Sequence, residues 1–188
     1  MHSFTTERLL IRPLAEQDKA MYINLYTDAK IMRNIGEPLS VEAAENAFDR
    51  VLKAMTKKQL TVITWAIVTL DNNECIGLQA LNWQSSALAG LTETAEIGIM
   101  LLRNSNGKLL PEEAMGALME YAFSHLAINT INATYAKGNL ATKRFVKKLG
   151  FTLKLDPELG SKLDNTDNCY EYFQKEQWQK KIITKILP

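Results

Sequence analysis

The hydrophobic and polar positions of this chain follow two spacings, one typical of strands and one typical of helices. Residues 62–70 are almost all apolar and rich in β-branched side chains, which is typical of a central strand covered on both faces. Residues 44–55 place Ala44 and Phe48 on one stripe at helical spacing, and Ser40 stands where the N-cap of that helix is expected. The pattern therefore predicts a sheet on which amphipathic helices pack.

The other segments add strands and helices in an order that defines the fold class. Apolar, β-rich runs predict strands at 9–14, 74–83, 94–102, 130–135, 151–155 and 169–173. Helical stripes run through 21–29 and 110–125, and Asp71-Asn72-Asn73 is a turn signal between two strands. The order β-α-α-β-β-β-α-β-α-β-β predicts an α/β (α+β) fold, with one mixed, mostly antiparallel central sheet of about seven strands and helices on both faces.

Composition and charge narrow the classes of function. The chain has no repeat, low-complexity segment or linker, so residues 1–188 are expected to form a single domain. Its net charge is +1, which gives no global electrostatic argument for binding nucleic acid or an anionic membrane. No apolar run is long enough to span a membrane and the N-terminus has no secretory pattern, so a cytoplasmic location is expected. Cys75 and Cys169 suggest buried thiols rather than a disulfide, and two histidines are too few for a metal cluster.

The segment from Asn139 to Phe151 carries the strongest local signal. Its apolar positions, among them Phe145 and Leu149, follow a 3.6-residue period, while basic residues cover the other face. Gly150 stands where a helix commonly ends in a left-handed residue. An ordinary amphipathic helix with a glycine cap would look the same, so this segment alone leaves both interpretations open.

Together with two other pieces, the segment resembles the GCN5-related N-acetyltransferases (GNAT). The pieces are Thr6-Glu7-Arg8-Leu9-Leu10-Ile11-Arg12-Pro13-Leu14, Ala95-Glu96-Ile97-Gly98 and the N-x-x-[S/A/T]…K-x-G-F pattern of 139–151, in that order. They are similar above all to the ribosomal-protein N-terminal acetyltransferase branch (RimJ/RimL-like). The resemblance implies direct acetyl transfer from acetyl-CoA, without a metal, to an amine.

The acceptor that this resemblance implies is the α-amine of a ribosomal or other protein N-terminus. A small-molecule amine, such as a polyamine or an aminoglycoside, is an alternative, and so is a CoA-binding protein with weak or lost catalysis. The protein is expected to be a monomer or homodimer that binds neither membrane nor nucleic acid directly.

The resemblance also locates the pyrophosphate of the cofactor in the loop after strand 94–102. Backbone N–H groups at a helix N-terminus bind phosphate, and the family supplies them from a Q/R-x-x-G-x-G/A loop. Here Asn104 stands at the Q/R position, Gly107 at the first glycine and Leu109 at the second. Because the backbone makes the contacts, Leu109 can serve if its dihedral angles are ordinary. A plain strand-to-helix connection is the alternative.

Further cofactor contacts are expected on both sides of the same cleft. They are Met100, Leu101 and Leu102 through their backbone, Arg103, Lys108 and Arg144 through their charge, and Asn139 through its side-chain amide. Solvated positions for the charged residues, and a helix-capping role for Asn139, are the alternatives.

Two residues are candidates for the proton transfers of acyl transfer from a thioester to an amine. Glu96 is an acidic residue inside an apolar strand, where burial would raise its pKa toward that of a useful general base; an ion pair or a solvent-facing position is the alternative. Many members of the superfamily place a tyrosine acid seven residues after the motif asparagine, and Val146 stands there. Thr142 fills the position of a hydroxyl in the ribosomal-protein branch, or it bonds backbone in the first helical turn. Asn132 and Tyr135 are weaker alternatives for the base.

Overall fold

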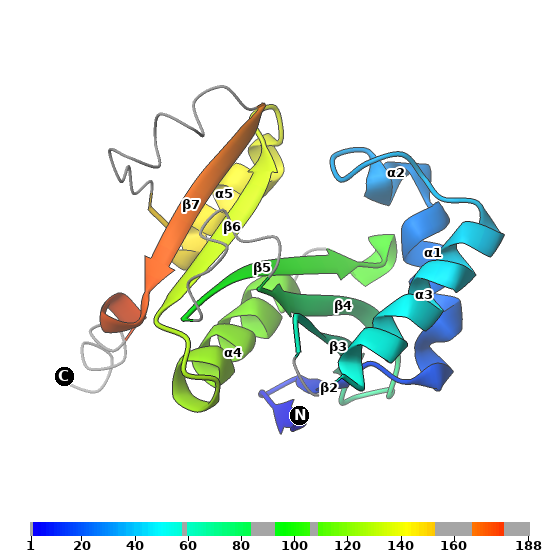
Figure 1. Cartoon of the computed structure of the whole chain (residues 1–188), viewed down its shortest axis with the longest axis horizontal. Helices are drawn as coiled ribbons and strands as arrows, with labels where there is room; N and C mark the ends of the chain where they lie inside the picture. Colours follow the sequence, from blue (N-terminus) through cyan, green and yellow to red (C-terminus); the bar gives the residue numbers. More distant parts are fainter. Residues whose placement is uncertain (1, 58–59, 84–92, 106–108, 153–166, 179–188) are drawn as a thin grey trace.

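The structure, a computed structural model, describes residues 2–57, 60–83, 93–105, 109–152 and 167–178 (Figure 1). Its described strands form a seven-stranded sheet whose order follows the chain. The strands are β1 (Phe4–Thr5), β2 (Leu9–Pro13), β3 (Val62–Thr69), β4 (Cys75–Asn82), β5 (Thr94–Leu101), β6 (Thr130–Ala136) and β7 (Asn168–Gln174). The helices are α1 (Lys19–Thr27), α2 (Ala29–Met32), α3 (Val41–Met55), α4 (Leu110–His125) and α5 (Leu140–Leu149), with 3-10 turns at Glu16–Asp18 and Arg103–Ser105.

One pair of neighbouring strands differs in direction from the others. The pairs from β1 to β5 and the pair β6–β7 are antiparallel, whereas β5 and β6 run parallel. A parallel pair needs a crossover connection, and α4 supplies it. The parallel pairing is short, because the register joins Thr94–Glu96 to Thr130–Asn132 and ends there. Beyond Glu96 the two described strands part.

The sheet separates two apolar cores, with α1 and α3 on one face and α4 and α5 on the other (Figure 1). Leu25, Phe48 and Ala66 belong to the core under α1 and α3. Trp65 and Leu118 belong to the core under α4 and α5. Because side chains of a strand alternate between the two faces, neighbouring residues of β5 reach opposite sides of the sheet.

The expected mixed sheet with helices on both faces is confirmed, and so are the helix ends expected from the sequence. The Ser40 hydroxyl accepts a hydrogen bond from the Ala43 N–H at 3.1 Å and caps α3. Gly150 ends α5 with a φ of 98°, in the left-handed region that favours glycine. The Phe151 N–H returns to the carbonyl of Val146, which completes the cap.

Three boundaries differ from the expectations, each for a local reason. Phe4–Thr5 pairs with β2 as an extra edge strand, too short for a periodic pattern to reveal. The stripe expected at 21–29 is interrupted because the Asp28 carboxylate caps the separate helix α2. The strand expected at 151–155 is reduced, among the described residues, to one bridge between Thr152 and Tyr172, and residues 153–155 lie outside the described part.

Candidate functional site

The parting of β5 and β6 leaves backbone groups of β5 without a strand partner in the described ladder. The Leu102 N–H donates to the Ile76 carbonyl of β4 at 2.8 Å. Because backbone groups alternate along an antiparallel strand, Met100 also faces β4, whereas Ile99 and Leu101 face the parted side. The N–H groups of Met100 and Leu102 are therefore turned away from the parted side, against the expectation. Leu101 faces that side as expected, and so does Ile99, a position that the sequence did not reveal.

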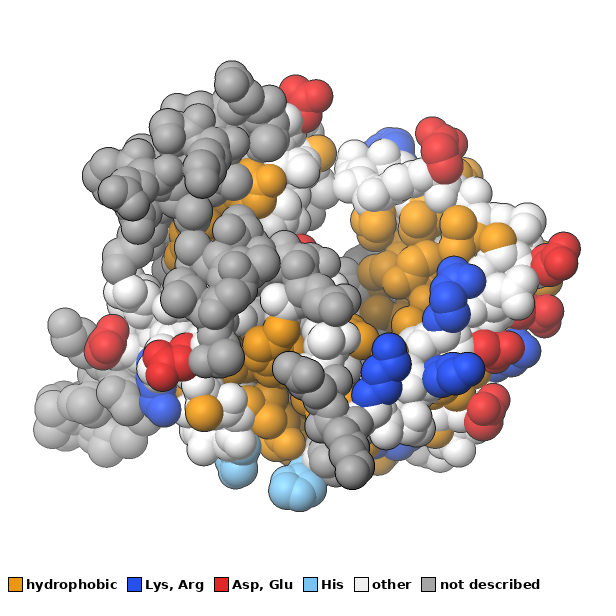
Figure 2. Space-filling model, viewed as in Figure 1, with side chains coloured by type: hydrophobic (Ala, Val, Ile, Leu, Met, Phe, Trp, Pro, Cys, Tyr) orange, Lys and Arg blue, Asp and Glu red, His pale blue; other side chains and the backbone are white. Residues whose placement is uncertain are grey.

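The same part of β5 borders a hollow in the molecular surface. Figure 2 shows this hollow between the α1–α2 side and the β6–β7 side, with apolar side chains gathered around α1 and α2. Gly98 is exposed, and a β-carbon added to it would meet no atom within 4 Å. Met100 and Leu102 share the pleat side of Gly98 and pack, partly exposed, against the core under α1 and α3. The wall of the hollow is thus apolar and open at Gly98.

Glu96 stands at the last residue pair before the strands part. Its carboxylate accepts a hydrogen bond from the Thr134 hydroxyl at 3.2 Å and also interacts with Asn132. Burial raises the pKa of Glu96, and the bonds from Thr134 and Asn132 oppose that effect without cancelling it. The group is therefore a half-buried carboxyl with a raised pKa, on the same pleat side of β5 as Gly98, which suits a general base.

The two weaker candidates for the base lie on opposite faces of β6. Asn132 is fully buried and lies beside Glu96, on the face that bears the hollow. Tyr135 belongs to the opposite core, and its hydroxyl donates a short hydrogen bond to Glu171. Burial and Glu171 both raise the pKa of Tyr135 above its ordinary range. Tyr135 is therefore bonded to Glu171 on the face of the sheet opposite to Glu96.

Asn139 and Thr142 begin α5 as a connected pair. The Asn139 side-chain oxygen accepts a hydrogen bond from the Thr142 N–H at 3.1 Å, so Asn139 caps the helix. The cap uses the amide oxygen and leaves the amide NH₂ as a donor for a second role. Thr142 is partly exposed, and its hydroxyl makes none of the hydrogen bonds between described residues. The back-bonded alternative for Thr142 is thus not seen in the described part of the chain.

Leu109 departs from the expectation of ordinary dihedral angles. It precedes α4 with a φ of 61° and a ψ of 14°, in the left-handed region that leucine rarely adopts. Its side chain is 55% exposed, so packing gains little from a leucine there. The expectation is wrong because the chain must turn sharply into α4, and that turn is the reason a glycine suits this position. Leucine holds the turn at a cost in strain.

The first turn of α4 carries two carboxylates that are already engaged. Glu113 accepts hydrogen bonds from the Thr6 hydroxyl and from Arg8, which ties β2 to the helix. Glu112 accepts a 2.8 Å hydrogen bond from Lys148 of α5 and another from its own N–H. Partial burial acts to raise the pKa of Glu112, but these bonds outweigh it and lower the pKa. The helix N-terminus therefore has an internal anion close to the place expected for the pyrophosphate.

The remaining expected cofactor contacts occupy different surroundings. Arg103 lies 4.0 Å from Asp28, on the side of α1 and α2. The side-chain oxygen of Asn104 accepts a hydrogen bond from the Ser105 hydroxyl at 3.3 Å. Arg144 is exposed on α5. Gly107 and Lys108 lie outside the described residues.

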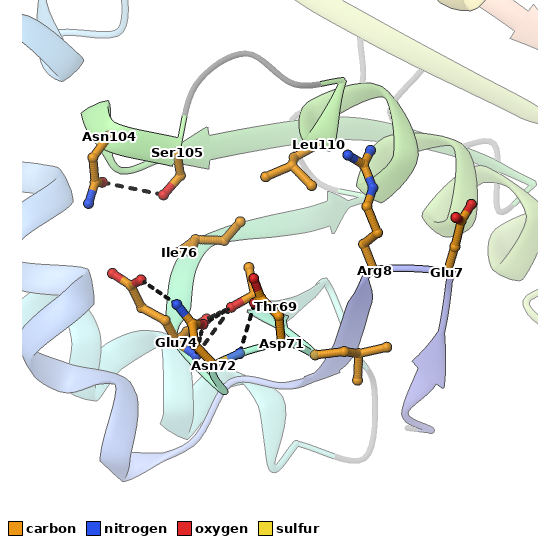
Figure 3. A pocket seen from close by; sticks show the side chains of 11 residues that line it. Glu7, Arg8, Thr69, Asp71, Asn72, Glu74, Ile76, Asn104, Ser105 and Leu110 are labelled. Atoms are coloured by element: carbon orange, nitrogen blue, oxygen red, sulfur yellow. Dashed lines mark hydrogen bonds between the residues drawn. The ribbon is translucent and has the colours of Figure 1, made fainter.

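A cavity of about 440 Å³ lies beside this loop, at the end of β2, β3 and β4 (Figure 3). Its lining includes the carboxylates of Glu7, Asp71 and Glu74, and its cation, Arg8, is bound to Glu113. Neither Glu96 nor Thr142 reaches it. The acidic lining disfavours a phosphate inside this cavity.

Other kinds of site receive no support from the described residues. No group of three metal-binding side chains occurs among them. Cys75 and Cys169 are free thiols, and burial raises the pKa of Cys75 to about 11, which keeps that thiol protonated and poorly nucleophilic. None of the described helices has the length and apolar character that a membrane span requires.

Comparison with known proteins agrees with the fold and identifies the family. The family model of the acetyltransferase (GNAT) domain matches residues 8–152. The uncharacterized N-acetyltransferase YoaA of Bacillus subtilis (strain 168) is 26% identical over 147 residues, which are 78% of this chain and 80% of YoaA. The uncharacterized N-acetyltransferase YnaD of the same strain is 28% identical over 150 residues, which are 80% of this chain and 82% of YnaD.

Solved structures share the fold over nearly the whole chain. The acetyltransferase from Agrobacterium tumefaciens str. C58 matches with a TM-score of 0.73 at 22% identity, over 93% of this chain and 95% of that chain. Spermidine N-acetyltransferase from Vibrio cholerae, solved with CoA and spermine, matches with a TM-score of 0.71 at 17% identity, over 93% and 99%. The chain thus belongs to the GNAT family and is an acetyl-CoA-dependent N-acetyltransferase.

Proposed function

We propose that this acetyltransferase acts on α-amines, above all on the N-terminus of a protein or peptide, as in the ribosomal-protein branch of the family. The observation that carries the proposal is the proton machinery. Among the described residues of β5 and β6, Glu96 is the one acidic side chain, and Val146 stands where many relatives have a tyrosine acid. An enzyme so equipped gains most from an acceptor that is already partly neutral.

The difference between amines is large at neutral pH. An α-amine with a pKa near 7.8 is about 14% neutral at pH 7, whereas a lysine side chain near 10.4 is about 0.04% neutral. At pH 7 the neutral, nucleophilic fraction of an α-amine is therefore several hundredfold larger than that of a lysine side chain. A polyamine also carries further charges along its length, which the apolar wall formed by Met100 and Leu102 would not compensate.

The parted edge of β5 fits acetyl-CoA as the cosubstrate. The N–H groups of Ile99 and Leu101 face the parted side, where an extended pantetheine arm could pair with them as an added strand would. The amide NH₂ of Asn139 can donate to a pantetheine carbonyl while its oxygen caps α5. We place the pyrophosphate at 103–109, beside the N-terminus of α4.

The chemistry then divides among few groups. The amine nitrogen bonds to the acetyl carbon, the carbon–sulfur bond breaks, and the electron pair leaves with the sulfur. Glu96 takes the proton from the amine, held in position by Thr134. The Thr142 hydroxyl is proposed to donate a hydrogen bond to the leaving sulfur. We further propose that residues 1–188 form one acetyltransferase domain.

Acetylation of a peptide panel tests the acceptor class. The panel contains one peptide with a free N-terminus, the same peptide with a blocked N-terminus and an internal lysine, and spermidine. We expect acetylation of the free N-terminus to be at least tenfold faster than that of either other amine, given the pKa difference. Faster modification of the internal lysine or of spermidine would refute the α-amine preference.

Calorimetry of acetyl-CoA tests the cosubstrate independently of the acceptor. We expect saturable binding, because the parted edge of β5 offers backbone N–H groups that have no strand partner in the described ladder. Absence of binding at millimolar acetyl-CoA would overturn the assignment of this site.

A further inference from the structure

Three side chains lie in register across the sheet at the place where β5 and β6 part. Glu96 of β5 pairs with Asn132 of β6, and Asn132 pairs with Tyr172 of β7. Residues directly opposite each other share a face, with β-carbons about 5 Å apart. The row Glu96–Asn132–Tyr172 therefore crosses the face that bears the hollow, and the proposed base stands at one end of it.

The hydroxyl of Tyr172 is the unusual member of this row. Tyr172 is 4% exposed, and its hydroxyl has no hydrogen-bond partner among the described residues. Buried tyrosine hydroxyls normally have a partner, because burying an unpaired polar group is unfavourable. On the opposite face of β6 the hydroxyl of Tyr135 has such a partner in Glu171. The contrast indicates that Tyr172 serves a group that the described part of the chain does not supply.

The surroundings keep this hydroxyl in its donor form. Burial raises the pKa of Tyr172, and nearby Tyr170 raises it further, so the hydroxyl stays protonated over the working pH range. Asn132 interacts with Glu96 and lies between the hydroxyl and the base. A ligand that places an amine at Glu96 and an acceptor oxygen near Tyr172 would satisfy both ends of the row.

An α-amine acceptor has such an oxygen. The carbonyl carbon of an N-terminal residue is two bonds from the amine nitrogen, whereas a lysine side chain or a simple alkylamine has only methylene groups there. We infer that the Tyr172 hydroxyl donates a hydrogen bond to this carbonyl and is a specificity-determining residue for α-amines. This inference rests on the proposed function. A site built to hydrogen-bond one oxygen rejects analogues that lack it, since its own polar group is then left unpaired.

Two matched amines test the inference. Leucinamide and isoamylamine differ only in the carboxamide group, so the second lacks the carbonyl that Tyr172 would bind. In Tyr172→Phe we expect kcat/KM for leucinamide to fall roughly tenfold to a hundredfold, with isoamylamine unchanged. Comparing each amine between wild type and variant cancels the different pKa values of the amines. Tyr121→Phe is the control, because Tyr121 is a buried tyrosine on the opposite face of the sheet.

The outcomes separate this inference from the function on which it rests. An equal fall for both amines would make Tyr172 structural, and no fall for either would remove it from the acceptor site; both results overturn the inference. If wild type itself prefers isoamylamine to leucinamide, the α-amine proposal fails. If wild type prefers leucinamide and the ratio of the two kcat/KM values is the same in Tyr172→Phe as in wild type, only the role of Tyr172 fails. The variant removes one oxygen that makes no bond among the described residues, so an unchanged unfolding temperature is expected.

Discussion

The Glu96 end of β5 and the loop at its other end, the two parts of the proposed site, are built in different ways. Around Glu96 the groups are ordered by regular sheet register, and Thr134 holds the carboxylate. At the loop, Leu109 adopts a left-handed conformation and Glu112 brings a carboxylate to the helix N-terminus. The end proposed to carry out the chemistry is thus well formed, while the end proposed to bind phosphate has a strained residue and an internal carboxylate.

This difference teaches that turnover and cosubstrate affinity can vary separately in this protein. Proton transfer at Glu96 depends on the sheet, which is a rigid element. Phosphate binding depends on a short loop and on the balance between Glu112 and Lys148, which are exposed enough for solvent and salt to screen. The following substitutions test whether the two ends are in fact separate.

Glu96→Gln gives the largest expected effect. It keeps the shape of the side chain but removes its basicity, so kcat should fall roughly 100-fold or more while acetyl-CoA binding is retained. Since burial raises the pKa of Glu96, the ionised carboxylate is unfavourable in the folded state. The stability that this raised pKa contributes is lost as the pH rises through the pKa of Glu96 in the folded protein. The variant should therefore be at least as stable as wild type at neutral pH. Steady-state kinetics, calorimetry and thermal unfolding measure the three quantities, and a parallel loss of acetyl-CoA affinity would break the separation.

Gly98→Val places a branched side chain in the open hollow beside Glu96. We expect the KM for the amine to rise roughly tenfold or more through misplacement, with no loss of stability. Gly77→Ala is the contrasting variant, because its new β-carbon would lie 2.3 Å from the Met100 carbonyl oxygen and disturb the β4–β5 pairing. Equal effects of both variants on stability would show that Gly98 is not open to solvent.

Leu109→Gly sharpens the comparison at the loop. Relief of the left-handed strain exceeds the added backbone entropy of glycine, so stability should rise by about 0.5–1 kcal/mol. CoA binding should stay unchanged or tighten, and the gain in binding free energy should be at most about 1 kcal/mol. Urea unfolding and calorimetry measure both effects. Leu109→Ala keeps the β-carbon and serves as the control without a gain, and a large loss of CoA affinity in the glycine variant would reveal a positive role for the leucine.

Glu112→Gln is expected to have the smallest effect. It removes a negative charge from the phosphate end and frees Lys148, so CoA should bind up to about fivefold more tightly at low salt. Lys148→Gln should change affinity in the opposite direction. Because the pKa of Glu112 is lowered, its charge persists to acidic pH, and the difference between wild type and variant should fade only when the pH falls below the ordinary carboxyl range. If neither substitution changes the affinity for CoA, the pyrophosphate binds elsewhere.

Much of the fold follows from local patterns in the sequence, because periodicity reports directly on burial. The stripe of α3, its Ser40 cap and the Gly150 cap of α5 are local features of this kind. The point at which β5 and β6 part depends on long-range register, which no local pattern contains. For the same reason the sequence could single out Glu96 as a candidate base, but not its hydrogen-bond partner Thr134.

The loop end shows where reasoning from residue types is weakest. Leucine at position 109 suggests an ordinary backbone, yet the entry into α4 imposes a left-handed one. The pair Glu112–Lys148 joins residues 36 positions apart on two helices, so charge patterning within either helix does not predict it. Ile99 was missed because the role proposed for it belongs to a backbone N–H, which every residue except proline has.

The ratio of wild-type to Glu96→Gln turnover as a function of pH tests the central claim most directly. Leucinamide and saturating acetyl-CoA are used between pH 6 and pH 9. If Glu96 is the base, the ratio should be roughly 100 or more near neutral pH and shrink as pH rises, because the amine then loses its proton to solvent. A ratio that stays constant over the whole range would contradict the claim and reassign Glu96 to structure.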